Sequence, residues 1–103
     1  MAGRFAILQN MKRAELEDGI RQAILESVQV EGLTAADLPA GSPLFGDDGV
    51  GLDSIDALEI GVALKKKYNV NFKANSEQNR ERFRSIASLA NFISESAGIS
   101  LED

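Results

Sequence analysis

The fold is decided by residues 46–64, which read GDDGVGLDSIDALEIGVAL. A glycine-rich acidic loop runs into Asp53 and Ser54, and a helix-like apolar pattern follows directly. The backbone N–H groups and the dipole at the start of a helix favour an anion. We therefore predict that the Ser54 hydroxyl stands at a helix entrance that suits a phosphate ester.

The apolar spacing predicts a helix over residues 54–68. Asp53 is its natural N-cap. Asp56 and Glu59 near its start and Lys65–Lys67 near its end carry the charges that the helix dipole prefers. One face of this helix is expected to contact something other than its own core, because its apolar residues form two stripes: Ile60, Leu64 and Tyr68 make the first, and Ile55, Leu58 and Val62 the second.

Gly61 stands in the middle of this helix, where it costs about 1 kcal/mol relative to alanine. The absence of a side chain at Gly61 must therefore allow a contact that compensates for this cost. Two explanations are open: close packing of a neighbouring helix, or space for a bound chain.

The rest of the chain predicts three more helices. Residues 12–30 form the first, which Gly32 ends. A short polar helix follows at Ser76–Phe83, and Ser85 caps a further helix over residues 85–96, before Gly98. No strand and no internal repeat is predicted. The expected fold is thus an all-α four-helix bundle of three main helices and one short one.

A long connection over residues 32–53 joins the first two helices. Thr34–Leu38 predicts one short helical turn, whereas the prolines and glycines exclude a longer helix. Apolar residues recur along the connection, and we expect them to pin it across the bundle, with Phe45 as the strongest anchor: Leu38, Leu44, Phe45 and Leu52.

The composition narrows the class of function. We interpret residues 1–103 as a single domain, in which residues 1–11 form a flexible lead-in or a strand-like arm through Phe5–Leu8. The chain has no cysteine and no histidine, so only carboxylate catalysis stays open to an enzyme. No apolar run could cross a bilayer and no signal-peptide core is present, so we expect a cytoplasmic protein without membrane insertion.

Charge is unevenly distributed along the chain. The net charge of −5 argues against nucleic-acid binding. Residues 1–59 hold eleven acidic and four basic side chains, a balance of −7, whereas residues 60–103 hold five acidic and seven basic, a balance of +2. The acids around Ser54 form either a solvated face or a docking surface for basic partners: Asp47, Asp48, Asp53, Asp56 and Glu59.

Several catalytic and binding motifs fail here. The acidic stretch lacks the ligands of a calcium loop, because glycine and leucine stand at ligand positions. Gly49–Gly51 does not complete a dinucleotide fingerprint, and no phosphate-loop lysine is present. Ser54 has no Gly-x-Ser-x-Gly frame and no histidine to activate it. We therefore predict no catalytic residue and no metal ligand; on physical grounds alone, Asp53 and Ser54 form a helix N-cap.

Phe45–Asp48 followed by Gly51–Glu59 resembles the phosphopantetheine attachment region of the acyl carrier protein family. The resemblance extends over most of the chain, from the helix at residues 12–30 to the helix at residues 85–96. It is strongest over residues 44–68, where the block LDSIDALE is its most specific part. The resemblance implies a four-helix bundle with a long first loop.

The resemblance also implies a function. Ser54 would receive 4′-phosphopantetheine from coenzyme A through a separate phosphopantetheinyl transferase. The arm's thiol would then carry acyl intermediates as thioesters to acyl-transferring and acyl-modifying enzymes of fatty-acid, lipid or polyketide-type biosynthesis. Asp53 would help the transferase recognise the site. Partner enzymes would recognise surface residues of the helix that begins there: Ile55, Asp56, Glu59 and Val62. The carrier would be a monomer and not itself an enzyme.

Two features depart from typical fatty-acid carriers. The helix at residues 54–68 ends in Lys65–Lys67 where an acidic run is usual, and residues 73–84 are longer and more basic than usual. These departures indicate a specialised carrier with its own partners. The alternatives are an aminoacyl or peptidyl carrier, a D-alanyl carrier, and an unmodified helical interaction module.

Overall fold

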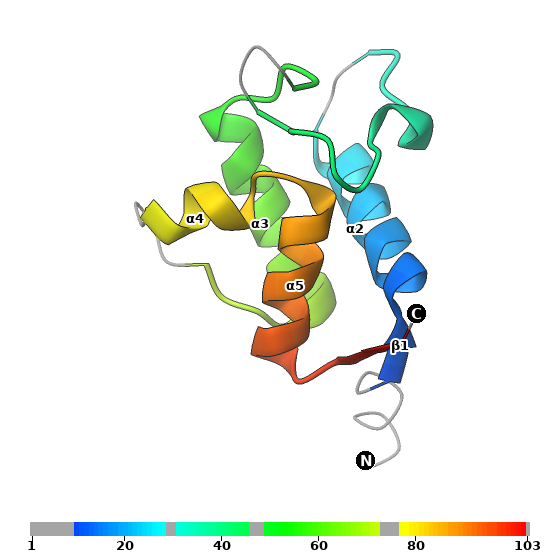
Figure 1. The fold of residues 1–103 in the computed structure, drawn as a ribbon. Helices are drawn as coiled ribbons and strands as arrows, with labels where there is room; N and C mark the ends of the chain where they lie inside the picture. The colour runs from blue at the N-terminus through cyan, green and yellow to red at the C-terminus, as the bar shows by residue number, and fades with distance from the viewer. Residues whose placement is uncertain (1–9, 29–30, 46–48, 73–76, 103) are drawn as a thin grey trace.

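The computed structural model describes residues 10–28, 31–45, 49–72 and 77–102. Within them the chain is mostly helical, with four α-helices, one 3₁₀ helix and a small two-stranded parallel sheet (Figure 1). In chain order the elements are β1 (Asn10–Lys12), α2 (Arg13–Ser27), η1 (Ala35–Asp37), α3 (Ser54–Tyr68), α4 (Glu77–Arg82), α5 (Ile86–Ala97) and β2 (Ser100–Glu102).

The core lies between α2, α3 and α5, because each of these helices turns one apolar stripe inward. α2 packs against both α3 and α5. In Figure 1 the axes of these three helices are roughly aligned, with α2 running opposite to α3 and α5, and the short α4 lies crosswise beside them. None of the helices in the described ranges is long and apolar enough to cross a membrane. The side chains at the centre of the core are fully buried: Leu16, Ile20, Ile24, Ile60, Leu64, Ile86, Leu89 and Ile93.

Two helix boundaries confirm the sequence predictions because their caps are local. α3 spans residues 54–68 as predicted, and Asp53 is its N-cap. α5 begins after Ser85, whose hydroxyl accepts a hydrogen bond from the Ser88 N–H, and it ends at Gly98 with a φ of 70°. Such a positive φ favours glycine.

α2 is shorter than the predicted helix over residues 12–30. It ends at Ser27, and Val28 is already extended, with φ −105° and ψ 145°. The Val28 side chain nevertheless lies buried in the core. The predicted end at Val30 lies outside the described residues. α4 matches the predicted short helix, and Phe83 is buried beside it as its anchor.

The two strands correct the expectation of an all-α chain. β1 pairs in parallel with β2, and the central pair is Met11 with Leu101. Three residues are too few to show the alternation that predicts a strand, and the two partners come from opposite ends of the chain. Both side chains of the central pair are partly buried against the core. The sheet therefore joins the described start and end of the chain; the predicted arm at Phe5–Leu8 lies outside the described residues.

The connection between α2 and α3 is pinned by apolar anchors, as predicted, but their order of importance differs. Leu38 and Leu44 are each 1% exposed and Leu52 is 4% exposed. Phe45, the expected strongest anchor, is only partly buried. The leucines enter the core, whereas the Phe45 ring packs edge-on against the Phe83 ring at a centroid distance of 6.3 Å.

Backbone hydrogen bonds also hold this connection. The Leu44 N–H donates to the Arg84 carbonyl at 2.9 Å, and the Ala87 N–H donates to the Ala40 carbonyl at 2.8 Å. On the other side, Arg21 of α2 donates from Nε to the Leu38 carbonyl at 2.7 Å. The connection is thus tied to α2 and to the junction of α4 and α5, which sets where α3 can begin.

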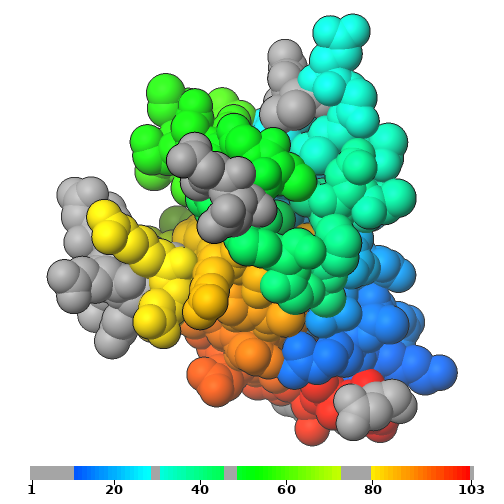
Figure 2. Space-filling view, turned by 45° about the horizontal axis from the view of Figure 1, so that its top comes forward, coloured from blue at the N-terminus to red at the C-terminus, as the bar shows by residue number. Residues whose placement is uncertain are grey.

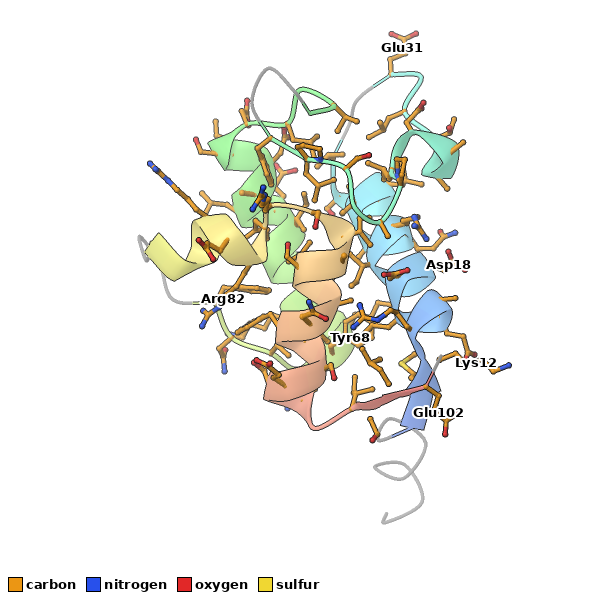
Figure 3. All side chains as sticks on the ribbon, viewed as in Figure 1. Lys12, Asp18, Glu31, Tyr68, Arg82 and Glu102 are labelled. Atoms are coloured by element: carbon orange, nitrogen blue, oxygen red, sulfur yellow. The ribbon has the colours of Figure 1, made fainter. Side chains whose placement is uncertain are left out.

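α2 and α3 approach each other closely at Gly19, a contact that sequence reasoning did not identify. A Cβ atom at this position would overlap the Tyr68 hydroxyl oxygen. The Lys67 ammonium donates to the Gly19 carbonyl at 3.1 Å, beside Tyr68, which is labelled in Figure 3. Glycine is therefore needed at position 19 to let the last turn of α3 reach α2.

Burial raises the pKa of the Tyr68 hydroxyl above its ordinary value of 10.0. A group whose pKa is raised by folding stabilises the fold below the unfolded pKa, and that contribution is lost as pH rises through the folded pKa. We expect the free energy of unfolding to fall above about pH 10, and to fall less steeply in Tyr68→Phe. Chemical denaturation of both proteins between pH 8 and pH 11 measures this, and parallel curves would contradict it.

Candidate functional site

Ser54 is the first residue of α3, and its side chain is exposed. Within the described residues, the Ser54 hydroxyl makes no hydrogen bond. The space-filling view in Figure 2 shows the start of α3 on the surface, at the end of the molecule that also carries η1 and the connection. The Ser54 side chain is therefore accessible to solvent at this end of the molecule.

Asp53 and Asp56 form a reciprocal cap around the serine. The Asp53 carboxylate accepts hydrogen bonds from the Ile55 and Asp56 N–H groups, both at 3.0 Å. The Asp56 carboxylate accepts from the Asp53 N–H at 2.9 Å. This capping box satisfies three of the backbone N–H groups that the start of a helix leaves unpaired.

The cap changes the account of anion binding at the helix entrance. The Ile55 and Asp56 N–H groups, which could have received a phosphate, already serve the Asp53 carboxylate. A phosphate on Ser54 would gain from the helix dipole, but it would lie beside a carboxylate that holds the first turn. The described geometry thus assigns Asp53 a structural role that is independent of any partner.

We expect Asp53→Ala to lower the free energy of unfolding by about 1–2 kcal/mol, because the N-cap is lost. Asp53→Asn keeps an acceptor oxygen at the cap and should stay within about 0.5 kcal/mol of the parent protein. Urea denaturation of the three proteins tests the cap. If a phosphopantetheinyl transferase also recognises the negative charge of Asp53, it should modify both variants more slowly than the parent. Equal rates of modification for Asp53→Asn and the parent would show that the transferase recognises the capped helix and not the charge.

Beside Ser54, α3 carries an exposed apolar face, which we call the α3 strip: Ile55, Leu58 and Val62. Their side chains are 64%, 68% and 54% exposed, respectively. They follow one another at helical spacing, on a face turned away from the stripe that enters the core. These are the large apolar side chains that the described part of the chain leaves in solvent, which confirms that α3 has a second apolar face.

Charge changes sign along the α3 strip. Glu59 lies between Ile55 and Val62 on the same face, and Lys66 follows Val62 by four residues. Lys65 and Lys66 are exposed, and no ion pair within the described residues involves either of them. Lys67 instead turns to α2 and bonds the Gly19 carbonyl. The lysine run therefore leaves two cations on the exposed surface beside the α3 strip and contributes one to the contact with α2.

The basic segment after α3 is used in part by the structure itself. The Arg82 guanidinium stacks over the Phe92 ring, with its carbon 4.2 Å from the ring centroid. Figure 3 labels Arg82 on α4, on the far side of the molecule from α2. Arg80 and Arg84 are exposed, whereas Lys73 lies outside the described residues, as do Asp47 and Asp48.

Four phenylalanine rings form a cluster beside α3, which we call the aromatic cluster: Phe45, Phe72, Phe83 and Phe92. The Phe72 ring centroid lies 4.7 Å from that of Phe83 and 4.8 Å from that of Phe92. The rings come from the connection, the segment after α3, the segment after α4, and α5. Only the tertiary structure brings the four rings together, because they lie far apart in the sequence.

Gly61 of α3 faces this cluster. A Cβ atom at position 61 would lie 3.6 Å from Phe83 Cζ and 3.8 Å from Phe72 Cδ2, both ordinary van der Waals distances. Close helix packing therefore does not require glycine here, since a methyl group fits. Of the two explanations offered by the sequence, the first is not supported by these distances.

We expect Gly61→Ala to raise the free energy of unfolding by about 0.5–1 kcal/mol, because alanine has the higher helix propensity and its methyl group fits against the two rings. Gly19→Ala is the matched contrast: it makes the same change in a helix, but its methyl group would overlap Tyr68. That variant should be less stable than the parent. Urea denaturation measures both, and a destabilised Gly61→Ala would contradict the contact distances.

A comparison of the sequence with protein-family models found no match, and a comparison with curated proteins found none either. Among the described residues, no group of three or more acidic side chains is arranged to hold a metal ion. Ser54, the cap around it and the exposed α3 strip are thus the features of the described residues that indicate a function.

Proposed function

We propose that this protein is an acyl carrier protein, in which Ser54 carries 4′-phosphopantetheine and the α3 strip presents the arm to partner enzymes. The observation that supports this proposal most strongly is an exposed serine that has no hydrogen-bond partner among the described residues and that lies directly before an exposed apolar helix face. A structural N-cap explains Asp53, but it does not explain why three large apolar side chains remain in solvent beside it.

The chemistry fits what the chain has and lacks. The serine needs only to be accessible, because the transferase supplies the base that a chain without histidine cannot provide. The arm supplies the thiol that a chain without cysteine lacks. The protein itself catalyses nothing in this proposal; it holds acyl groups as thioesters and delivers them to acyl-transferring and acyl-modifying enzymes.

The α3 strip suits transient docking. A single helix face with three apolar residues is much smaller than the roughly 800 Å² per partner of a stable interface. Opposite charges at its two ends steer an encounter and raise its rate without demanding tight affinity. In this proposal Asp53, Ile55, Asp56, Glu59 and Val62 contact partners, and Leu58, the most exposed apolar side chain of the three, joins them.

The remaining parts of the proposal are a four-helix bundle, a cytoplasmic location and a monomeric state. The pathway is fatty-acid, lipid or polyketide-type biosynthesis. Lys65 and Lys66 on the partner-facing side support a specialised carrier with partners that differ from those of the housekeeping one. An aminoacyl, peptidyl or D-alanyl carrier would use the same serine with another cargo, and an unmodified interaction module would use the α3 strip without the arm.

Incorporation of the arm tests the proposal. The protein is incubated with coenzyme A, a divalent metal ion and a broad-specificity phosphopantetheinyl transferase, and its intact mass is recorded. We expect one phosphopantetheine on the parent and none on Ser54→Ala. Ser96→Ala is the matched control, because it removes an exposed helical serine elsewhere and should leave the modification unchanged.

No added mass on the parent would refute the carrier function and would favour an interaction module. Added mass that persists in Ser54→Ala would refute the site. The cargo is then identified by offering the modified protein acyl, aminoacyl and D-alanyl donors with their respective ligases.

A further inference from the structure

Ser54 and Gly61 lie on the same face of α3. Seven residues separate them, which is about two helical turns and about 10 Å along the axis. A chain attached to Ser54 and running down that face would meet Ala57 and then Gly61, where α3 has no side chain. Gly61 is thus the point on α3 at which an attached chain could approach the helix backbone most closely.

The space opposite Gly61 is occupied by the aromatic cluster. Phe83 Cζ and Phe72 Cδ2 lie 3.6 and 3.8 Å from where a Cβ atom would stand, so there is room for a methyl group before the rings are reached. Phe83 is 7% exposed, so its ring belongs to the core, whereas Phe72 is half-buried at the surface of the cluster. A longer chain could enter here only by displacing a ring.

The rings are held in place from both sides. The Phe72 ring packs between those of Phe83 and Phe92 at centroid distances of 4.7 and 4.8 Å, tilted by 41° and 38° from their planes. Arg82 covers the outer partner, Phe92. Aromatic pairs in such contact gain more than their buried area alone provides, so displacing Phe72 breaks two ring contacts at once.

We propose that Phe72 and Phe83 keep the attached acyl chain outside the bundle, because the two rings close the space opposite Gly61. The inference rests on the proposed carrier function. It makes Phe72 a specificity-determining residue, because a carrier that leaves its chain in solvent suits short or polar acyl groups, whose exposure to water is tolerable.

Chain-length dependence of stability tests this inference. Acetyl, butyryl and octanoyl forms are prepared from the corresponding acyl-coenzyme A with the transferase, and the Tm of each is compared with that of the acetyl form. For the parent we expect no difference. In Phe72→Ala the octanoyl chain should enter opposite Gly61 and raise the Tm by about 4 °C or more.

Phe92→Ala is the matched control, because it removes the same side chain from the same cluster without uncovering Gly61. Its Tm should not depend on chain length. A second change, Gly61→Leu in the Phe72→Ala background, should abolish the octanoyl effect by filling the opened space. The amide chemical shift of residue 61 gives an independent readout in the variants that retain glycine.

The outcomes separate the two proposals. Absence of any acyl-pantetheine on the parent refutes the carrier function. If the parent carries the acyl-pantetheine and its Tm rises with chain length, Phe72 and Phe83 do not close the space opposite Gly61. Loading with no octanoyl effect in Phe72→Ala refutes it too, since an uncovered Gly61 would then admit no chain.

Discussion

Leu58→Asp combined with Val62→Asp is expected to lower kcat/KM for phosphopantetheinyl transfer to Ser54 by about 30-fold or more. These two side chains are 68% and 54% exposed, so they contribute little to the core. If they fill an apolar pocket of the transferase, their loss removes contacts of the kind that dominate interface energies, about 2 kcal/mol, which corresponds to about 30-fold in rate.

The same double variant should fold. Both side chains are exposed, valine and aspartate have similar helix propensities, and the change from leucine to aspartate at position 58 costs less than about 0.7 kcal/mol. Asn91→Asp on α5 is the matched control: it adds a negative charge at an exposed site away from the α3 strip and keeps the oxygen that accepts from Arg13. Unfolding monitored by circular dichroism verifies folding. An unchanged kcat/KM for the folded double variant would show that the transferase docks elsewhere.

Gly49→Ala is expected to lower the free energy of unfolding by roughly 2–3 kcal/mol. A Cβ atom at this position would lie 2.7 Å from the Leu44 carbonyl carbon, 2.8 Å from the Phe45 nitrogen and 2.9 Å from the Leu44 oxygen. These are backbone atoms, and they cannot rotate aside. The Leu44 N–H is moreover tied to the Arg84 carbonyl, so the chain there cannot shift without breaking that hydrogen bond.

Gly41→Ala tests whether the effect belongs to the contact or to glycine loss in general. It lies in the same connection, with no atom within 4 Å of its Cβ position and no positive φ. Its free energy of unfolding should be unchanged or higher by up to about 1 kcal/mol, because the unfolded chain loses freedom. Urea denaturation of both variants measures the difference, and equal stabilities would contradict the close approach at Gly49.

The double variant in the α3 strip and Gly49→Ala both affect the modification of Ser54, but by different routes. Substitutions in the α3 strip change the surface to which the transferase would dock beside Ser54. Gly49→Ala instead displaces the loop that leads into Ser54. A loop displaced by Gly49→Ala should also slow modification, since Leu52, which anchors the segment before Asp53, lies in the core. Rate loss with stability retained identifies a docking residue; rate loss with stability lost identifies a positioning one.

The features that could be predicted from the sequence are those set by interactions between residues close together in the chain. The limits of α3 were predictable because Asp53, the acidic first turn and the lysines act within one or two turns of the residues that they stabilise. Its two apolar faces follow from helical spacing. Ser54 at the helix entrance is a consequence of the same local signals.

The tertiary structure decided everything that depends on residues distant in sequence. The parallel pairing of Met11 with Leu101 joins opposite ends of the chain and leaves no local pattern. Gly19 and Gly49 are required only because Tyr68 and the Leu44 backbone come to lie against them. By itself the sequence determined where a serine meets the start of a helix. Only the packing of Phe72 and Phe83 over Gly61 decided what space an attached chain would find, because the volume left beside a helix is set by the elements folded against it.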